Sequence, residues 1–196
     1  MQRLYLMRHG ETQSNAAGIL QGGLDSPLTE RGAAQAQAAD SWMRSRAAKI
    51  GAVCTSPLGR ARQTLEIMRN ADSHLAALPI EVEPCLSELR YGAFEGHALG
   101  DLPDDPWKPG ETYRAHGGEA QADTSVRIVH GLARIMRKHP DADVLAISHG
   151  TVMGLFWAAS SRNRTCPPPS LDNGCILIFD FDRTRGVFTY LEEIVP

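Results

Sequence analysis

The alternation of short apolar segments with longer amphipathic ones is the feature that most constrains how this chain folds. Short runs of apolar side chains predict strands at 3–7, 51–55, 80–83, 143–147, 175–181 and 186–193. Apolar residues at helical spacing, or capping and Pro residues at a segment's start, predict helices at about 29–48, 57–70, 119–138 and from the fourth strand to about 160. Such alternation is typical of a mostly parallel sheet with helices on both faces. We therefore predict an α/β fold, a three-layer sandwich.

Two segments lack either pattern and are predicted to be irregular. Residues 13–28 are rich in Gly, Ser, Asn and Pro and are expected to form a loop. Residues 91–117 are rich in Gly and Pro and are expected to form a lid-like excursion from the sheet. A length of 196 residues suits one domain, so we expect a single domain over 1–196 that carries this excursion.

Charge and composition exclude some classes of partner. The net charge is −3 and the pI is near 6.2, so the chain as a whole has no attraction for nucleic acid or for an anionic membrane. A site for an anion must therefore be built locally, from a few arginines. We expect a small-molecule partner, neither nucleic acid nor membrane, and a protein that acts as a monomer or a homodimer.

The cysteines and the start of the sequence bear on the compartment. Cys54, Cys85, Cys166 and Cys175 form no C-x-x-C pair and no zinc-ribbon spacing, so we expect reduced and mostly buried thiols. The first residues hold too few apolar side chains for a signal peptide, and no segment approaches the ~18 apolar residues of a membrane-spanning helix. These observations predict a cytoplasmic protein.

Residues able to handle an anion follow the predicted strands at their carboxyl ends. Arg8 and His9 leave the first strand, Arg60 lies shortly after the second, and His149 follows the fourth. Glu88 comes after the third strand. In open sheets of this kind, ligands bind beyond the carboxyl ends of the strands. We therefore expect these side chains to converge at one edge of the sheet.

Two histidines, two arginines and a carboxylate are suited to a phosphoryl group. Arginine is a planar, permanently charged fork that matches pairs of phosphate oxygens. Histidine can attack phosphorus through a free ring nitrogen or donate a proton. Because phosphoryl transfer mainly requires positioning and charge neutralisation, arginines could serve without magnesium. Glu88 could then protonate the departing oxygen, if burial and the nearby phosphate keep it protonated.

Each of these residues also has a structural interpretation. A single histidine at a strand end is commonly a hydrogen-bonded structural residue, and a single arginine in the first turn of a helix is commonly a surface charge. A metal site is another alternative, but it needs three or four ligands, and the arginines beside His9 and His149 would repel a cation. We expect neither a metal nor another cofactor.

Several motifs, in a fixed order, resemble those of one family. The tripeptide RHG recurs by chance, but a series of motifs from residue 2 to about residue 178 is far more specific. The chain strongly resembles the histidine phosphatase superfamily, also called the cofactor-dependent phosphoglycerate mutase-like family. The motifs that carry the resemblance are RHGET (8–12), QGGLDSPLTERGAAQA (21–36), TSPLGRARQT (55–64), LSELRYGAFEG (86–96), HGGEA (116–120), VLAISHG (144–150) and DNGCI (172–176).

The resemblance implies a phosphoglycerate mutase-like sandwich and a role for each central residue. His9 would be the nucleophile that becomes phosphohistidine. Arg8, Arg60 and His149 would hold the phosphoryl oxygens. Glu88 would be the general acid of the first step and the base that activates water in the second.

The resemblance also implies further contacts with substrate. Asn15 would touch the phosphate, while Gln21 and Gly22 would lie on the substrate side. Tyr91 and Gly150 complete the predicted substrate-binding set, which also includes the arginines, the second histidine and the glutamate.

The excursion distinguishes two activities within the family. Mutases return the phosphate to a bound acid, whereas phosphatases transfer it to water. Between Gly96 and Gly117 the cationic residues are Lys108 and Arg114, and the segment also contains four carboxylates. Such a segment would bind a doubly charged phosphoacid poorly. We therefore favour a metal-independent phosphomonoester hydrolase acting through a phosphohistidine. A small phosphoglycerate mutase-like phosphotransferase is the alternative, and a non-catalytic phosphate-binding relative is a third.

Four aromatic residues in the excursion bear on the substrate. Tyr91, Phe94, Trp107 and Tyr113 indicate a leaving group with some apolar or ring character. The phosphorylated metabolite itself stays open: sugar phosphates, nucleotide-pathway intermediates, ribazole phosphate and phosphoamino acids all fit this prediction.

Overall fold

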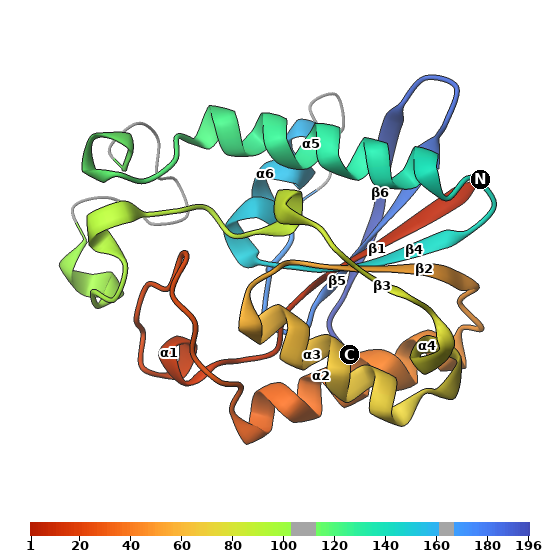
Figure 1. The fold of residues 1–196 in the computed structure, drawn as a ribbon, viewed down its shortest axis with the longest axis horizontal. Coiled ribbons are helices and arrows are strands. Elements are labelled where there is room, and N and C mark those ends of the chain that lie inside the picture. Colours follow the sequence, from red (N-terminus) through yellow and green to blue (C-terminus); the bar gives the residue numbers. More distant parts are fainter. Residues whose placement is uncertain (103–112, 161–166) are drawn as a thin grey trace.

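A computed structural model describes residues 1–102, 113–160 and 167–196, which form a central sheet covered by helices on both faces (Figure 1). The sheet has six strands in the order β3-β2-β4-β1-β5-β6. The strands are β1 (Gln2–Arg8), β2 (Ile50–Thr55), β3 (Ile80–Val82), β4 (Asp143–Ser148), β5 (Ile176–Asp182) and β6 (Val187–Ile194). The helices are α1 (Gln13–Ala16), α2 (Glu30–Ser45), α3 (Gly59–Ala71), α4 (Ser73–Ala77), α5 (Gln121–Lys138) and α6 (Gly150–Ser160).

The predicted mostly parallel sheet is confirmed. Strands β3, β2, β4 and β1 run parallel to one another, whereas β5 is antiparallel to β1 and to β6. The parallel strands are separated in sequence by helices, as a parallel crossover requires. Only a short turn joins β5 to β6, which permits an antiparallel hairpin.

Alternation along the central strand explains the three layers. In β1, Leu4 and Leu6 belong to one apolar cluster with α5 and α6, while Tyr5 and Met7 belong to another with α2 and α3. Successive side chains of a strand point to opposite faces, so a fully apolar run needs cover on both. Figure 1 shows α5 and α6 on one side of the sheet, and α2, α3 and α4 on the other.

Two short helices were not predicted. Helix α1 lies in the segment expected to be a loop, where Thr12 and Asn15 form a capping box. Helix α4 follows α3 directly, and the side chain of Asp72 caps it. With four and five residues, neither helix is long enough to show a helical period in the sequence. The predicted cap of α2 is confirmed, because the Thr29 hydroxyl accepts the N–H of Gly32.

Several smaller predictions can also be placed. Cys54, Cys85 and Cys175 are buried free thiols. The described parts of the 91–117 excursion contain three short 3-10 turns, at Gly92–Phe94, Leu99–Asp101 and Arg114–His116. None of the helices in the described part of the chain is long and apolar enough to span a membrane. The predictions for Trp107, Lys108 and Cys166 lie outside the described residues.

Two glycines bring the turn after β1 against helix α2. A Cβ on Gly10 would lie 2.2 Å from the carbonyl oxygen of Gly32, and a Cβ on Gly32 would lie 2.0 Å from that of Glu11. The backbone N–H of Thr29 also donates to the Glu11 carbonyl at 2.9 Å. The N-terminus of α2 thus holds the backbone on the carboxyl side of His9, and only glycine allows this separation.

We predict that Gly32→Ala lowers the free energy of unfolding by about 1–3 kcal/mol, because the added methyl group overpacks a backbone contact. Gly154→Ala is the matched control, since its Cβ would meet only the Leu171 Cδ1 atom at 3.0 Å, the end of a flexible side chain. Chemical denaturation of both variants is the measurement. Equal stability of the two would contradict the close contact described here.

Candidate active site

The predicted residues converge at the carboxyl edge of the parallel strands. In the sheet register Arg8 pairs with Ser148, and Thr55 with Ile147, so β1, β2 and β4 end at the same level. Backbone hydrogen bonds continue one residue further, from His9 to the Ser148 carbonyl at 3.0 Å. The residues that follow these strands therefore start from a common rigid frame.

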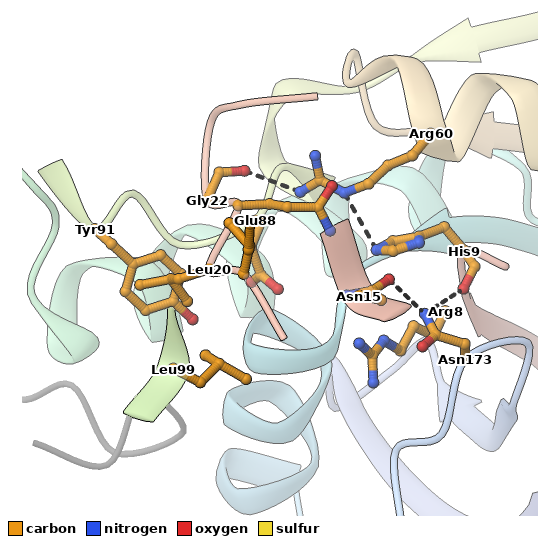
Figure 2. Close-up of a pocket in the computed structure, with 12 residues that line it drawn as sticks. Arg8, His9, Asn15, Leu20, Gly22, Arg60, Glu88, Tyr91, Leu99 and Asn173 are labelled. Atoms are coloured by element: carbon orange, nitrogen blue, oxygen red, sulfur yellow. Dashed lines mark hydrogen bonds between the residues drawn. The ribbon is translucent and has the colours of Figure 1, made fainter. Parts of the chain in front are cut away.

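His9 is a buried imidazole with a defined hydrogen position. Its Nδ1 lies 2.8 Å from the carbonyl oxygen of Gly10, which can only accept, so Nδ1 carries the hydrogen. Its Nε2 accepts a hydrogen bond from Arg60 Nε at 3.2 Å (Figure 2). Burial, and then the charges of Arg60 and Arg8, hold the pKa of His9 well below its usual value. His9 is thus neutral, with a lone pair on Nε2.

Arg60 is a buried guanidinium, and the loop before α2 wraps around it. Nη2 donates to the carbonyl of Gly22 at 2.9 Å (Figure 2). Nη1 donates to the carbonyl of Leu24 at 2.7 Å. Nη1 also forms an ion pair with Asp25 at 3.0 Å. Burial lowers the pKa of Arg60, and the carboxylates of Glu88 and Asp25 oppose that shift. The loop therefore fixes the orientation of the group that faces His9.

Glu88 lies at the N-terminus of α6. Its carboxylate accepts the N–H groups of Thr151 and Val152, each at 3.1 Å, and that of Leu89 at 2.8 Å. Backbone N–H donors and the positive end of a helix stabilise negative charge. The start of α6 thus fixes the position and orientation of the Glu88 carboxylate.

Arg8 and two asparagines line the opposite side of the site. The Arg8 guanidinium donates to the carbonyl of Leu171, and burial lowers its pKa. Asn173 Nδ2 donates to the His9 carbonyl and to Asn15 Oδ1, both at 3.2 Å (Figure 2). Asn173 lies in the motif DNGCI but was not among the predicted site residues. That motif was the available signal, because Asn173 follows none of the parallel strands.

A cavity of about 170 Å³ brings most of the predicted residues together. Of the predicted set, it is lined by Arg8, His9, Asn15, Gln21, Gly22, Arg60, Glu88 and Tyr91. Asn173 and the apolar residues Ile19, Leu20 and Leu99 also line it, although they were not among the predicted site residues. Of the predicted residues, His149 and Gly150 are not among those lining this cavity; Gly150 lines a neighbouring one.

His149 lies next to His9, the candidate nucleophile, and is completely buried. Its ring centroid is 5.1 Å from that of His9. Its Nε2 lies 2.8 Å from Ser56 Oγ. Burial, followed by the charge of Arg60, holds the pKa of His149 well below its usual value. The site therefore contains two neutral histidines and two guanidinium groups.

The remaining predicted residues are held by hydroxyl groups. Tyr91 is buried, its hydroxyl lies 2.6 Å from Thr151 Oγ1, and burial raises its pKa well above the usual value. Gln21 Nε2 donates to Thr12 Oγ1 at 2.9 Å.

Among the described residues, no three His, Cys, Asp or Glu side chains are grouped so that they could hold a metal ion. The arginine and asparagine N–H groups described above instead suit an anion.

Comparison with known proteins gives the class to which this fold and site belong. Bacillus stearothermophilus YhfR is similar in structure, with a TM-score of 0.81 and 30% identity over 97% of this chain and 95% of that one. A putative alpha-ribazole-5'-P phosphatase from Escherichia coli gives a TM-score of 0.73 and 27% identity over 97% and 94%. The class is the phosphoglycerate mutase-like α/β sandwich.

The family follows from the sequence match. Residues 4–193 match the histidine phosphatase superfamily (branch 1), and the chain belongs to this family. A curated relative, the probable phosphoglycerate mutase GpmB of Enterobacter sp. (strain 638), is 35% identical over 161 residues, which are 79% of this chain and 72% of that protein. The resemblance inferred from the motifs is thus confirmed.

The two buried histidines predict how stability depends on pH. Below the ordinary histidine pKa of about 6.5, the unfolded chain protonates both, while the folded protein keeps them neutral to a lower pH. Acid therefore favours the unfolded state, by at most about 1.4 kcal/mol per pH unit for each histidine. Urea titrations from about pH 7.5 to about pH 5 should show this loss of stability.

Two variants test the assignment of that slope. His149→Gln should flatten the dependence of unfolding free energy on pH, because one of the two depressed groups is gone. His130→Gln changes an exposed histidine and should keep the original slope. An unchanged slope in His149→Gln would show that His149 is not neutral in the folded protein.

Proposed function

We propose that this protein hydrolyses small phosphomonoesters through a phosphohistidine on His9, without a metal ion. One observation carries the proposal: the lone pair of His9 Nε2 faces the Nε–H of Arg60, at 3.2 Å, at a cavity that Arg8 also lines. A neutral imidazole nitrogen is a nucleophile, and guanidinium groups neutralise a phosphoryl group. An oxygen of the phosphoryl group would take over the Arg60 Nε–H and free the lone pair.

The first step would transfer the phosphoryl group to His9. Nε2 attacks phosphorus, a P–N bond forms, and the bond from phosphorus to the leaving oxygen breaks. That oxygen takes a proton from Glu88, which lines the same cavity. In this proposal Glu88 carries that proton when the substrate is bound.

The second step would return the enzyme to its starting state. Glu88 accepts a proton from water, the water oxygen attacks phosphorus, and the P–N bond breaks to release inorganic phosphate. Electrostatic stabilisation of the equatorial oxygens by Arg8 and Arg60 would serve both steps.

The cavity supports a small leaving group with apolar character. Ile19 pairs with Ala98 in an isolated antiparallel bridge, and the Leu99 N–H donates to the Gly18 carbonyl at 2.8 Å. This pairing sets Ile19, Leu20 and Leu99 along the cavity. A volume of about 170 Å³ lies below the roughly 300–1,000 Å³ of pockets for larger ligands.

The aromatic residues that suggested a ring-like leaving group have different positions. Tyr91 lines the cavity. Phe94 and Tyr113 instead pack against each other, with ring centroids 5.2 Å apart, and Tyr113 is fully buried. Trp107 lies outside the described residues. The apolar character proposed for the leaving group therefore depends on aliphatic side chains together with one tyrosine.

A mutase is the second candidate, because curated relatives that are 33–35% identical are named probable phosphoglycerate mutase. A mutase must hold a substrate that carries a carboxylate besides its phosphate. Among the described residues that line the cavity, Arg8 and Arg60 are the only cations, and the proposal assigns both to the phosphoryl group. This charge distribution favours the phosphatase.

We predict that 4-nitrophenyl phosphate is hydrolysed and that His9→Ala abolishes turnover while the fold is retained. Reaction quenched in the steady state should contain phosphate bound to protein in an acid-labile, base-stable form, because a P–N bond has this stability. His9→Ala should lack the bound phosphate, and the exposed-residue control His130→Ala should retain it. Full activity of His9→Ala would remove the proposed nucleophile.

The same preparation separates the two candidate activities. Incubation with 3-phosphoglycerate and a bisphosphate primer should give no interconversion of phosphoglycerates above the rate of phosphate release. Interconversion faster than phosphate release would establish the mutase and displace the phosphatase.

We predict that Glu88→Gln slows poor leaving groups far more than good ones. An alkoxide needs a proton as it departs, whereas 4-nitrophenolate does not, and a positioned acid contributes roughly 10²–10⁴-fold. Measuring kcat/KM over a series of aryl and alkyl phosphates gives the dependence on leaving-group pKa. Glu81→Gln, on β3 and away from the cavity, should keep the original dependence. An equal loss for all substrates would contradict the role as acid.

A further inference from the structure

Ser56 connects the candidate site to the sheet and is not among the predicted site residues. It follows β2 directly and is completely buried. Its backbone N–H donates to the Ile147 carbonyl of β4 at 3.0 Å. Its hydroxyl oxygen lies 2.8 Å from His149 Nε2 and accepts the N–H of Leu58 at 3.2 Å. The serine is thus held by backbone contacts to two elements and faces the second histidine.

These contacts determine where the hydroxyl hydrogen lies. A serine hydroxyl has one hydrogen and two lone pairs, and the Leu58 N–H occupies one lone pair. Among the described contacts of Ser56 Oγ, the acceptor left for the hydrogen is His149 Nε2. The reverse arrangement, with Nε2–H as the donor, would leave a buried hydroxyl hydrogen without an acceptor, which is costly.

The second nitrogen of His149 then carries the ring hydrogen. His149 is neutral, for the reasons of burial and neighbouring charge given above. If Nε2 accepts from Ser56, the single hydrogen of the neutral ring must be on Nδ1. This Nδ1 is buried and has no hydrogen-bond partner among the described residues. A buried N–H without a partner among these residues, in a ring 5.1 Å from that of His9, needs an acceptor, and an anion bound in the site could supply one.

We propose that Ser56 is a positioning residue that fixes His149 as the Nδ1–H tautomer, so that His149 gives the phosphoryl group a neutral N–H donor. The inference rests on the proposed function, since it assumes that a phosphoryl group is the anion. Both histidines then carry their hydrogen on Nδ1 but use opposite nitrogens: His9 attacks with bare Nε2, and His149 donates from Nδ1. A neutral donor stabilises charge on the phosphoryl oxygens without adding a third cation beside Arg8 and Arg60.

The hydrogen assignment can be tested on the unmodified protein. Two-bond ¹⁵N–¹H correlation spectra distinguish the two neutral tautomers of histidine, and His149→Gln identifies the signals of His149 by their loss. We expect the Nδ1–H form for His149. The Nε2–H form, or a charged ring at neutral pH, would overturn the proposal whether or not the protein is a phosphatase.

Removal of the serine hydroxyl tests its role. Ser56→Ala should shift His149 towards the Nε2–H form and raise the vanadate concentration needed for half-inhibition about tenfold, as expected for a lost hydrogen bond to a charged group. Thr55→Val is the matched control, because it removes the buried hydroxyl of the preceding residue. Among the described contacts, that hydroxyl donates only to the Ser56 carbonyl, at 3.3 Å. Ser56→Thr, which restores the hydroxyl, should restore the Nδ1–H form.

Two outcomes separate this inference from the proposed function. In the first outcome, the Nδ1–H tautomer of His149 is lost in Ser56→Ala, but no preparation has phosphatase activity. This result would support the positioning role of Ser56 and reject the proposed phosphatase function. An active phosphatase with unchanged tautomer and unchanged vanadate inhibition in Ser56→Ala would reject the positioning role alone. Because the tautomer is read first in the unmodified protein, a Ser56→Ala chain that fails to fold leaves that test in place.

Discussion

The hydrogen bond from Arg60 Nε to His9 Nε2 is the interaction on which the rest of the site depends. It joins a permanent charge to a neutral ring, and both side chains are buried, so both groups must be held by the protein. The carbonyls of Gly22 and Leu24 and the carboxylate of Asp25 hold the arginine. The Gly10 carbonyl holds the histidine. Breaking the contact of Gly22 with Arg60 or that of Gly10 with His9 would deprive a buried polar group of a hydrogen-bond partner.

Burial gives the two histidines a common property and two different uses. Desolvation and nearby guanidinium groups lower the pKa of each ring, so neither competes with the arginines for an anion by carrying charge. What differs is the neighbour of each Nε2. In His9 that nitrogen faces Arg60, at the cavity, while in His149 it faces Ser56, at the end of β2. The partner of one ring nitrogen thus decides what the other can do.

Helix α6 joins the parts of the site that lie on different strands. It begins directly after His149, and its first N–H groups hold the Glu88 carboxylate, which comes from the segment after β3. Thr151, in its first turn, also meets the hydroxyl of Tyr91. One helix start therefore sets a carboxylate and a tyrosine at a fixed place relative to the histidine before it. This arrangement exists only because β4 lies at the centre of the sheet, next to β1 and β2.

The sequence by itself determined the parallel core and the succession of strands and helices along the chain. It also determined the family and the residues from Arg8 to His149 that follow the strands. All of these can be predicted because apolar periodicity and motif order are local properties of the chain. It missed α1 and α4, which are too short for a period, and it placed Phe94 and Tyr113 beside the substrate, although they pack on each other. Only the tertiary structure decided which residues share one cavity, that Asn173 and Ser56 contact the two histidines, and which ring nitrogen each histidine presents. Those properties depend on contacts between segments far apart in the chain, and on burial, neither of which a local pattern contains.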